Sequence, residues 1–157
     1  MFREMRRKNQ LLPAEESISI LEKASSGVLS LLGDEGYPYG VPLSYVYLEG
    51  RLLFHGATVG HKIDALRRCE KASFCVIDRD EVKPELRTTW YRSVIAFGKV
   101  SLLEGEEKRR ALEAIGAKYS PQDPEGCRKE IEESFDHTAI ICLEIEHLSG
   151  KAAKALV

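Results

Sequence analysis

Residues 39–56 read YGVPLSYVYLEGRLLFHG, and this stretch has the pattern of a β-hairpin. Large apolar side chains recur at every second position of its first half, which is the period of a strand that buries one face. Glu49 and Gly50 then supply a two-residue turn, and RLLFHG continues as the second strand. A hairpin of this kind predicts an antiparallel sheet. The residues assigned to one face of the first strand are Val41, Leu43, Tyr45 and Tyr47.

Outward from the hairpin, further segments read as strands and helices. Gly98 interrupts the longest of the strands and is expected to form a bulge or bend. The polar stretch RDEVKPELRTTWY, residues 79–91, contains a proline and is expected to be a long connection. The other expected strands are SGVLSLLG, ASFCVID, RSVIAFGKVSLLEG and TAIICLEIEHLSGKA, and the expected helices are PAEESISILEKAS, HKIDALRRC, EEKRRALEAIGAKYS and PEGCRKEIEESF.

These elements predict a mainly β protein with flanking helices, of the α+β class. Consecutive hairpins favour an antiparallel sheet, and one short helix between strands does not make a doubly wound fold. The six expected strands are strongly apolar, so a closed or partly closed barrel best protects their edges. A chain of 157 residues favours a single domain over 1–157, with an N-terminal arm at 1–12 and a C-terminal tail at 149–157.

Composition and charge exclude several classes of protein. A formal net charge of −2 argues against a nucleic-acid binder, because phosphate contacts usually require a basic domain. No apolar run approaches the roughly 20 residues that cross a bilayer, so no membrane-spanning role is expected. The first residues lack the apolar core of a secretory signal, which predicts a cytoplasmic location. The four cysteines do not have the spacing of metal ligands, so no metal site is expected.

The stretch FHGATVGHKIDALRR, residues 54–68, reads as a strand end, a loop of small residues and the start of a helix. A helix N-terminus carries unpaired N–H groups and about half a positive charge, and His61 and Lys62 add to it. Gly56, Ala57 and Gly60 allow a ligand to approach the backbone. The turn therefore suggests a phosphate site, and a solvated turn with a basic helix is the alternative. Neither a nucleoside-triphosphate loop nor a Rossmann fingerprint is present.

Pro42 interrupts an otherwise regular strand, and proline cannot donate to a sheet ladder. Such a residue belongs at a sheet edge, at a bulge, or where a ligand meets the backbone. In the last case Val41, Leu43 and Ser44 would present free N–H and C=O groups to a flat heteroaromatic ring. A plain edge-strand proline is the alternative.

Five segments in series resemble one known family. Their order and spacing resemble those of the FMN-binding split-barrel proteins related to pyridoxamine 5′-phosphate oxidase. The segments are GYPYGVPLSYVY, LLFHGATVGHKIDALRR, ASFCVID, YRSVIAFGKV and LEIEHLSGKA. Among these proteins the chain is most similar to the nitroimidazole-resistance (Nim-like) group. The resemblance runs from about residue 15 to residue 153.

The resemblance implies a six-stranded split barrel that forms a homodimer, with one FMN in each of two clefts at the subunit interface. The backbone of the strand Val41–Ser44 would line the flavin ring. His55–Ala57 and the turn at His61 and Lys62 would hold the phosphate, and His55 matches an active-site histidine of the Nim-like group. The implied cofactor-binding residues are Val41, Pro42, Leu43, Ser44, His55, Gly56, Ala57, His61, Lys62, Trp90, Ser93 and Lys151.

Two departures from the family pattern concern the C-terminus. Leu148 stands where the tail motif of the group often has a tryptophan next to SGK. The long C-terminal segment with arginine that true pyridoxamine phosphate oxidases carry is missing, so oxidation of vitamin B6 phosphates is not expected.

The function implied by the resemblance is an FMN-dependent oxidoreductase. It would use NAD(P)H to reduce small electron-poor compounds such as nitroimidazoles, with hydride transfer through flavin N5. Trp90 and Ser93 would lie near the cleft, from either subunit, and His55 would orient a substrate or exchange a proton. A non-catalytic protein that binds, stores or senses flavin or haem is the alternative.

Overall fold

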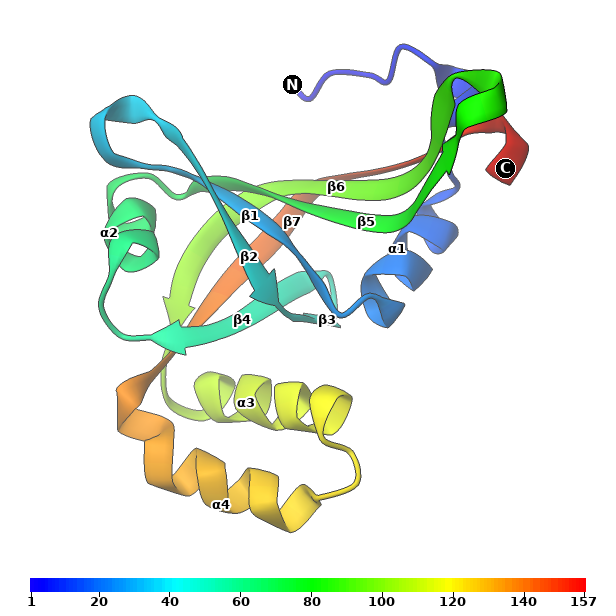
Figure 1. Cartoon of the computed structure of the whole chain (residues 1–157). Helices are drawn as coiled ribbons and strands as arrows, with labels where there is room; N and C mark the ends of the chain where they lie inside the picture. The colour runs from blue at the N-terminus through cyan, green and yellow to red at the C-terminus, as the bar shows by residue number, and fades with distance from the viewer.

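The computed structural model describes all residues of the chain, 1–157, and its centre is a curled antiparallel sheet of seven strands (Figure 1). Helices flank the curled sheet on several sides, which makes the chain mainly β with flanking helices. The strands are β1 (Ser26–Leu32), β2 (Pro38–Ser44), β3 (Val46–Leu48), β4 (Arg51–Ala57), β5 (Lys71–Lys83), β6 (Thr88–Leu103) and β7 (Thr138–Ala152). The α-helices are α1 (Ala14–Lys23), α2 (His61–Arg68), α3 (Gly105–Tyr119) and α4 (Pro124–Ser134).

The order of strands across the sheet is β2-β1-β5-β6-β7-β4-β3. The two edge strands, β2 and β3, are consecutive in the chain, so the sheet must curl to bring its edges together. The helices are all too short or too polar to cross a membrane. The antiparallel sheet and the class are as expected from the sequence.

The expected number of strands was wrong, because the single strand expected before Glu49 is divided at Tyr45. Its first part, β2, pairs with β1, and its second part, β3, pairs with β4. At the division the Tyr45 N–H donates to the hydroxyl of Tyr119 on α3, at 2.9 Å, and not to a neighbouring strand. The chain therefore changes from one edge of the sheet to the other at this residue.

Side chains on opposite faces of the sheet pack into two separate apolar clusters. The larger cluster fills the inside of the curled sheet, where the rings of Phe54 and Phe74 lie 5.0 Å apart. The smaller cluster lies between the other face and the α3–α4 hairpin, and includes Leu53. Since Leu53 and Phe54 are neighbours, β4 sends successive side chains to the two faces.

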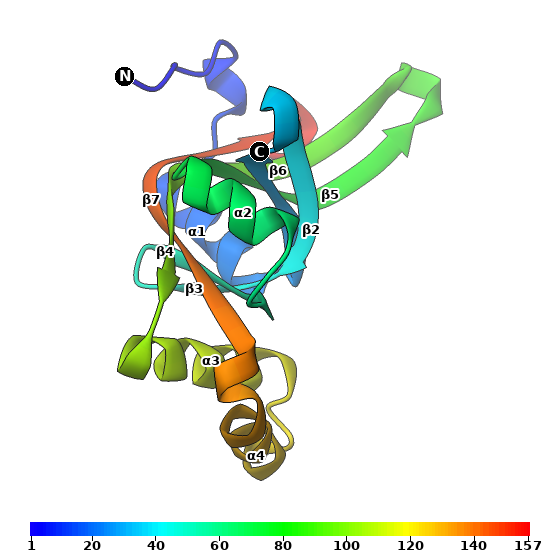
Figure 2. The same ribbon diagram turned by 90° about the vertical axis from the view of Figure 1, so that its left-hand side faces the viewer.

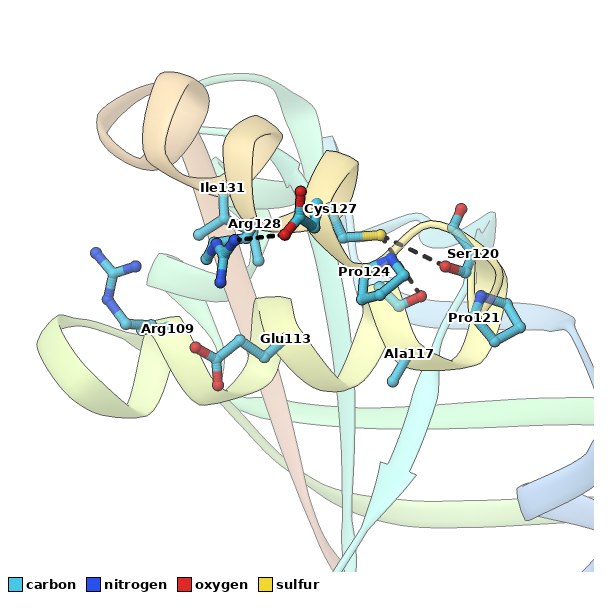
Figure 3. Close-up of a pocket in the computed structure, with 11 residues that line it drawn as sticks. Arg109, Glu113, Ala117, Ser120, Pro121, Pro124, Cys127, Arg128 and Ile131 are labelled. Carbon is cyan, nitrogen blue, oxygen red and sulfur yellow. Dashed lines mark hydrogen bonds and ion pairs between the residues drawn. The ribbon is translucent and has the colours of Figure 1, made fainter.

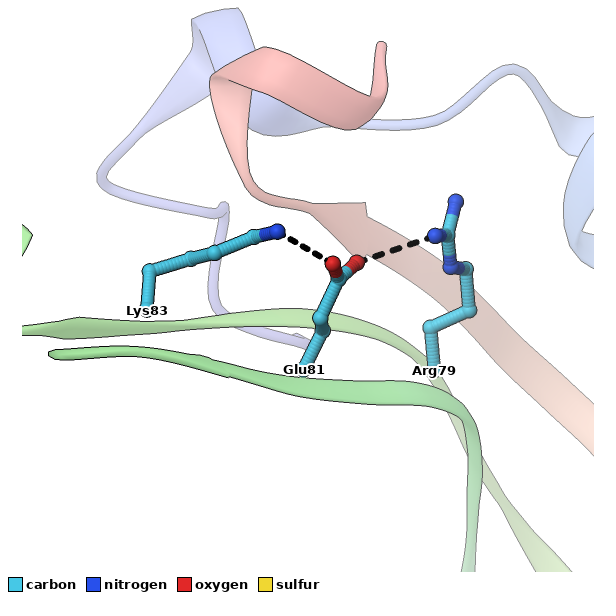
Figure 4. Close-up of polar contacts among 3 residues, drawn as sticks. All are labelled: Arg79, Glu81 and Lys83. Atoms are coloured by element: carbon cyan, nitrogen blue, oxygen red, sulfur yellow. Dashed lines mark hydrogen bonds and ion pairs between the residues drawn. The ribbon is translucent and has the colours of Figure 1, made fainter.

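The expected long connection at 79–91 was also wrong, because β5 and β6 continue through it and form a projecting hairpin, the β5–β6 arm (Figures 1 and 2). Its charged residues alternate along β5 and pair on one face of the strand. The carboxylate of Glu81 accepts from Arg79 at 3.0 Å and also from Lys83 (Figure 4). These contacts, and the hydrogen bond from Lys83 first among them, lower the pKa of the Glu81 carboxyl. A polar sequence therefore forms a regular strand, because both of its faces meet water.

The bulge expected at Gly98 is confirmed. The pairing of β6 with β7 shifts by one residue between Phe97 and Gly98. A Cβ atom at Gly98 would collide with the backbone carbonyl of Glu144, so no other residue fits the bend without moving the backbone.

Candidate functional site

The turn between β4 and α2 has the backbone of an anion site. Gly60 precedes the helix with a φ of 133°, a conformation that side chains disfavour. No side chain caps the helix, so the first N–H groups of α2 have no partner within the chain. The positive end of the helix dipole is therefore open toward the end of β4.

Lys62, in the first turn of α2, folds back against the end of β4. A Cβ atom at Gly56 would lie 2.9 Å from the Lys62 Cε and 3.2 Å from its Nζ, so the glycine makes room for this side chain. Lys62 forms no ion pair, and it is partly buried. An ammonium group, a bare strand backbone and an uncapped helix N-terminus thus converge on one place. We call this group of Gly56, Ala57 and residues 60–62 the cradle.

The imidazole of His61 is engaged elsewhere. Its ring stacks on Tyr39 of β2 with a centroid distance of 3.9 Å, and its Nε2 lies 3.9 Å from a carboxylate oxygen of Asp34. Asp34 also pairs with Arg68 of α2 at 2.9 Å. The His61 side chain therefore links α2 to the β1–β2 turn. Only the backbone N–H of His61 remains among the unpaired groups at the N-terminus of α2.

Strand β2 presents the segment Val41–Ser44 at the edge of the sheet. Val41 and Leu43 pack against the inner cluster, whereas Pro42 and Ser44 point outward and are exposed. Only β1 pairs with this strand, so the backbone groups on its other side are free of ladder bonds. Pro42 occupies an edge strand, as its missing N–H requires. Strand β2 also contacts β4, and its Tyr39 stacks on His61, so the beginning of β2 lies beside the start of α2.

The side chain of His55 lies on the opposite face of β4 from Gly56. It is exposed and lines a groove of about 610 Å³ beneath the α3–α4 hairpin, together with Tyr119 and Thr138. The imidazole has no hydrogen-bond or ion-pair partner in the chain. His55 therefore points away from Lys62, which packs on Gly56, because a strand directs neighbouring side chains to opposite faces.

Three implied site residues lie on β6 and β7, toward the arm. Ser93 pairs across the sheet with Lys151, and Trp90 lies in the arm with the Lys83 ammonium 4.5 Å from the centre of its ring. In both views the arm points away from α2 (Figures 1 and 2). Within one chain the implied site residues therefore form separate groups: the cradle with β2, the His55 groove, and the β6–β7 group.

Residues 13–152 match the family model described as pyridoxamine 5′-phosphate oxidase. The chain belongs to this family. The match covers every strand of the curled sheet, the cradle and the His55 groove. No curated protein sequence matches the chain.

Several solved structures have the same fold as this chain. One is a proposed 5-nitroimidazole antibiotic resistance protein from Bacteroides thetaiotaomicron. It is 21% identical, with a TM-score of 0.73 and 96% of each chain covered. The flavocytochrome Anf3 from Azotobacter vinelandii is 20% identical with a TM-score of 0.82, over 96% of this chain and 72% of that one. The FAD and haem binding protein from Mycobacterium smegmatis is 22% identical with a TM-score of 0.80, over 93% and 74%. At these identities the likeness is one of fold.

The structure adds residues to the candidate site that the sequence did not single out. Tyr39 stacks on His61, and Tyr119 holds the backbone where β2 ends. A second groove, of about 560 Å³, lies between α3 and α4 and contains none of the implied site residues (Figure 3). There the Cys127 thiol lies 3.6 Å from the Ser120 carbonyl. No sequence signal marks these contacts, because they join residues of different helices and strands.

Proposed function

We propose that the chain binds FMN, with the phosphate in the cradle and the flavin ring along β2. The observation that carries the proposal is the packing of Lys62 on Gly56 beside the uncapped N-terminus of α2. A phosphate monoester carries about −1.5 to −2 charges near neutral pH, which matches an ammonium group and a helix N-terminus. The free edge of β2 offers backbone groups to the polar rim of the ring.

We also propose that a second copy of the chain covers the outer face of the sheet. Four residues that pair directly across adjacent strands share this face. In order across the sheet they are Pro42 on β2, Val28 on β1, Cys75 on β5 and Ile95 on β6. Val28 is 41% exposed and Ile95 38% exposed. A connected apolar stripe of this kind is typical of a protein interface. In the dimer the β5–β6 arm would bring Trp90 to the cleft.

The reaction that fits such a site is the reduction of small electron-poor compounds, such as nitroimidazoles, with NAD(P)H as donor. Bound FMN would supply the redox chemistry, taking a hydride at N5. The chain would hold the phosphate at Lys62 and keep His55 free to exchange a proton with a substrate. The nitroimidazole-resistance protein among the structural neighbours supports this choice of substrate class. A cytoplasmic location stays a prediction.

Titration of the apoprotein with FMN and with riboflavin tests the binding. Because the cradle would contact only the phosphate, we expect FMN to bind at least about tenfold more tightly than riboflavin. Equal affinities would contradict the phosphate assignment. Anaerobic bleaching of the yellow holoprotein by NAD(P)H, followed by reoxidation with a nitroimidazole, tests the reaction. A holoprotein that no nicotinamide reduces is not this oxidoreductase.

A second candidate function is binding of flavin or haem without turnover. Two observations favour it: a structural neighbour described as an FAD and haem binding protein, and the exposed, unpartnered imidazole of His55. An imidazole is a common haem ligand. Absorbance separates the alternatives, because haem gives a Soret band and oxidised flavin gives two bands in the blue and near ultraviolet.

A further inference from the structure

The division between β2 and β3 is held by one phenol. The hydroxyl of Tyr119, the last residue of α3, accepts from the Tyr45 N–H at 2.9 Å. The same oxygen lies 2.6 Å from the carbonyl of Tyr45 and 2.6 Å from the carbonyl of Ser25, so it can donate its proton to either. Ser25 directly precedes β1, and Tyr45 directly follows β2. One side-chain oxygen therefore joins the start of β1 to the end of β2.

Lys118, the neighbour of Tyr119, repeats this arrangement. Its ammonium donates to the carbonyl of Ala24 at 2.5 Å and to the carbonyl of Tyr45 at 3.0 Å. It lies 4.2 Å from the centre of the Tyr45 ring and has no carboxylate partner. Burial lowers the pKa of this ammonium group. Partial burial of an ammonium group costs free energy, and the two carbonyl hydrogen bonds offset this cost. The role of Lys118 is therefore to hold these carbonyls.

The two side chains act where β2 has least support from the sheet. An edge strand has one neighbour, so β2 has half the ladder bonds of an inner strand. Its last pair with β1 is Ser44 with Ser26, directly beside the contacts of Tyr119 and Lys118. No further ladder pair supports this end of the strand, since the chain leaves for the opposite edge at Tyr45, whose side chain is buried and donates to the carbonyl of Leu21.

We propose that Tyr119 and Lys118 are positioning residues that set the place of the Val41–Ser44 backbone against the flavin ring. The inference rests on the proposed function, since it assigns the ring to this strand. Both residues act through the backbone of Tyr45, and neither touches the cradle, which holds the phosphate on another element. Loss of the contacts therefore moves the ring contacts and leaves the phosphate contacts in place.

The substitutions Tyr119→Phe and Lys118→Met test this separation. Tyr119→Phe keeps the ring and removes the one oxygen, which leaves the Tyr45 N–H without an acceptor. We expect roughly tenfold weaker FMN binding and a shifted flavin absorbance spectrum and reduction potential. The affinity for inorganic phosphate, measured by competition with FMN, stays as in the wild type. The amide hydrogens of residues 41–46 exchange faster in the apoprotein.

Tyr37→Phe and Lys129→Met are the matched controls, because Tyr37 is 72% exposed with no hydrogen bond from its hydroxyl, and Lys129 is exposed on α4. Both controls keep wild-type binding, spectrum and exchange. If Tyr119→Phe binds FMN like the wild type, with the same potential and exchange, the positioning role is refuted and FMN binding stands. An equal loss of FMN and inorganic phosphate binding also refutes it, since the effect is then global. If the wild type itself does not bind FMN, the proposed function fails, and this inference fails with it.

Discussion

Replacement of Gly56 by alanine tests the cradle through a single methyl group. The new Cβ would lie 2.9 Å from the Lys62 Cε, whereas ordinary contacts begin at 3.4 Å, so the lysine must retreat by at least about 0.5 Å. The obstructed atoms are the far end of a flexible side chain, so the free energy of unfolding should change by less than about 1 kcal/mol. The displaced ammonium should, however, contact a phosphate in the cradle less closely.

The magnitude follows from what the ammonium contributes. A charge-assisted contact to phosphate is worth about 1.5–3 kcal/mol, so Lys62→Ala should weaken FMN binding by roughly 10- to 150-fold. Gly56→Ala keeps the charge but displaces it, so we expect a loss of about 1 kcal/mol, or roughly fivefold. The effect should vanish for riboflavin, which has no phosphate.

A double-mutant cycle with fluorescence titration of the apoprotein is the assay. In the Lys62→Ala background there is no ammonium to displace, so Gly56→Ala should then have no further effect on the Kd for FMN. Additive losses in the double variant would refute the reasoning, and so would an equal loss of riboflavin affinity. Either result would mean that the methyl group acts on the strand and not on the lysine.

Three further predictions concern other parts of the fold. Ile95→Asp places a charge at the β6 end of the apolar stripe formed with Pro42, Val28 and Cys75, and should convert a dimer to monomers in sedimentation equilibrium; an unchanged mass would contradict the proposed interface. Gly98→Ala should destabilise the protein by about 2–4 kcal/mol in urea titration, since the backbone at Glu144 blocks the methyl group. Glu81 has a lowered pKa in the folded chain, so its contribution to stability is present above about pH 4.5 and is lost as the pH falls through the folded pKa. Thermal melts of Glu81→Gln should lack that part of the acid loss, and identical acid profiles would show that its pairs with Lys83 have no effect on stability.

The sequence predicts those parts of the fold that local chemistry decides. The turn at Glu49 and Gly50, the bulge at Gly98 and the start of α2 after Gly60 each depend on the conformation of one or two residues. The division at Tyr45 could not be read in this way, because its partner Tyr119 lies 74 positions along the chain. The arm at 79–91 was missed because the residues on both faces of its first strand, such as Arg79, Asp80 and Glu81, are polar. Most strands are recognised by an apolar face, which this segment lacks.

In the candidate site, too, the sequence predicts the residues that are close together in the chain and not those that are far apart. Lys62, Gly56 and the helix start are close in sequence, and the structure brings them together. The separation of His55 from Gly56 follows from strand geometry, since adjacent residues of a strand point to opposite faces. Trp90, Ser93 and Lys151 came from the family resemblance alone, and one chain does not bring them to the cradle.

The alternation along β4 has a consequence for how this protein can diversify. One strand end faces two compartments: Gly56 adjoins the ammonium of Lys62, and His55 opens into the groove beneath the helical hairpin. A library that randomises position 55 together with the groove wall therefore leaves the anchor at position 56 intact. Under the proposed function, selectivity for the substrate can then change while nucleotide binding does not, and laboratory evolution can exploit that independence.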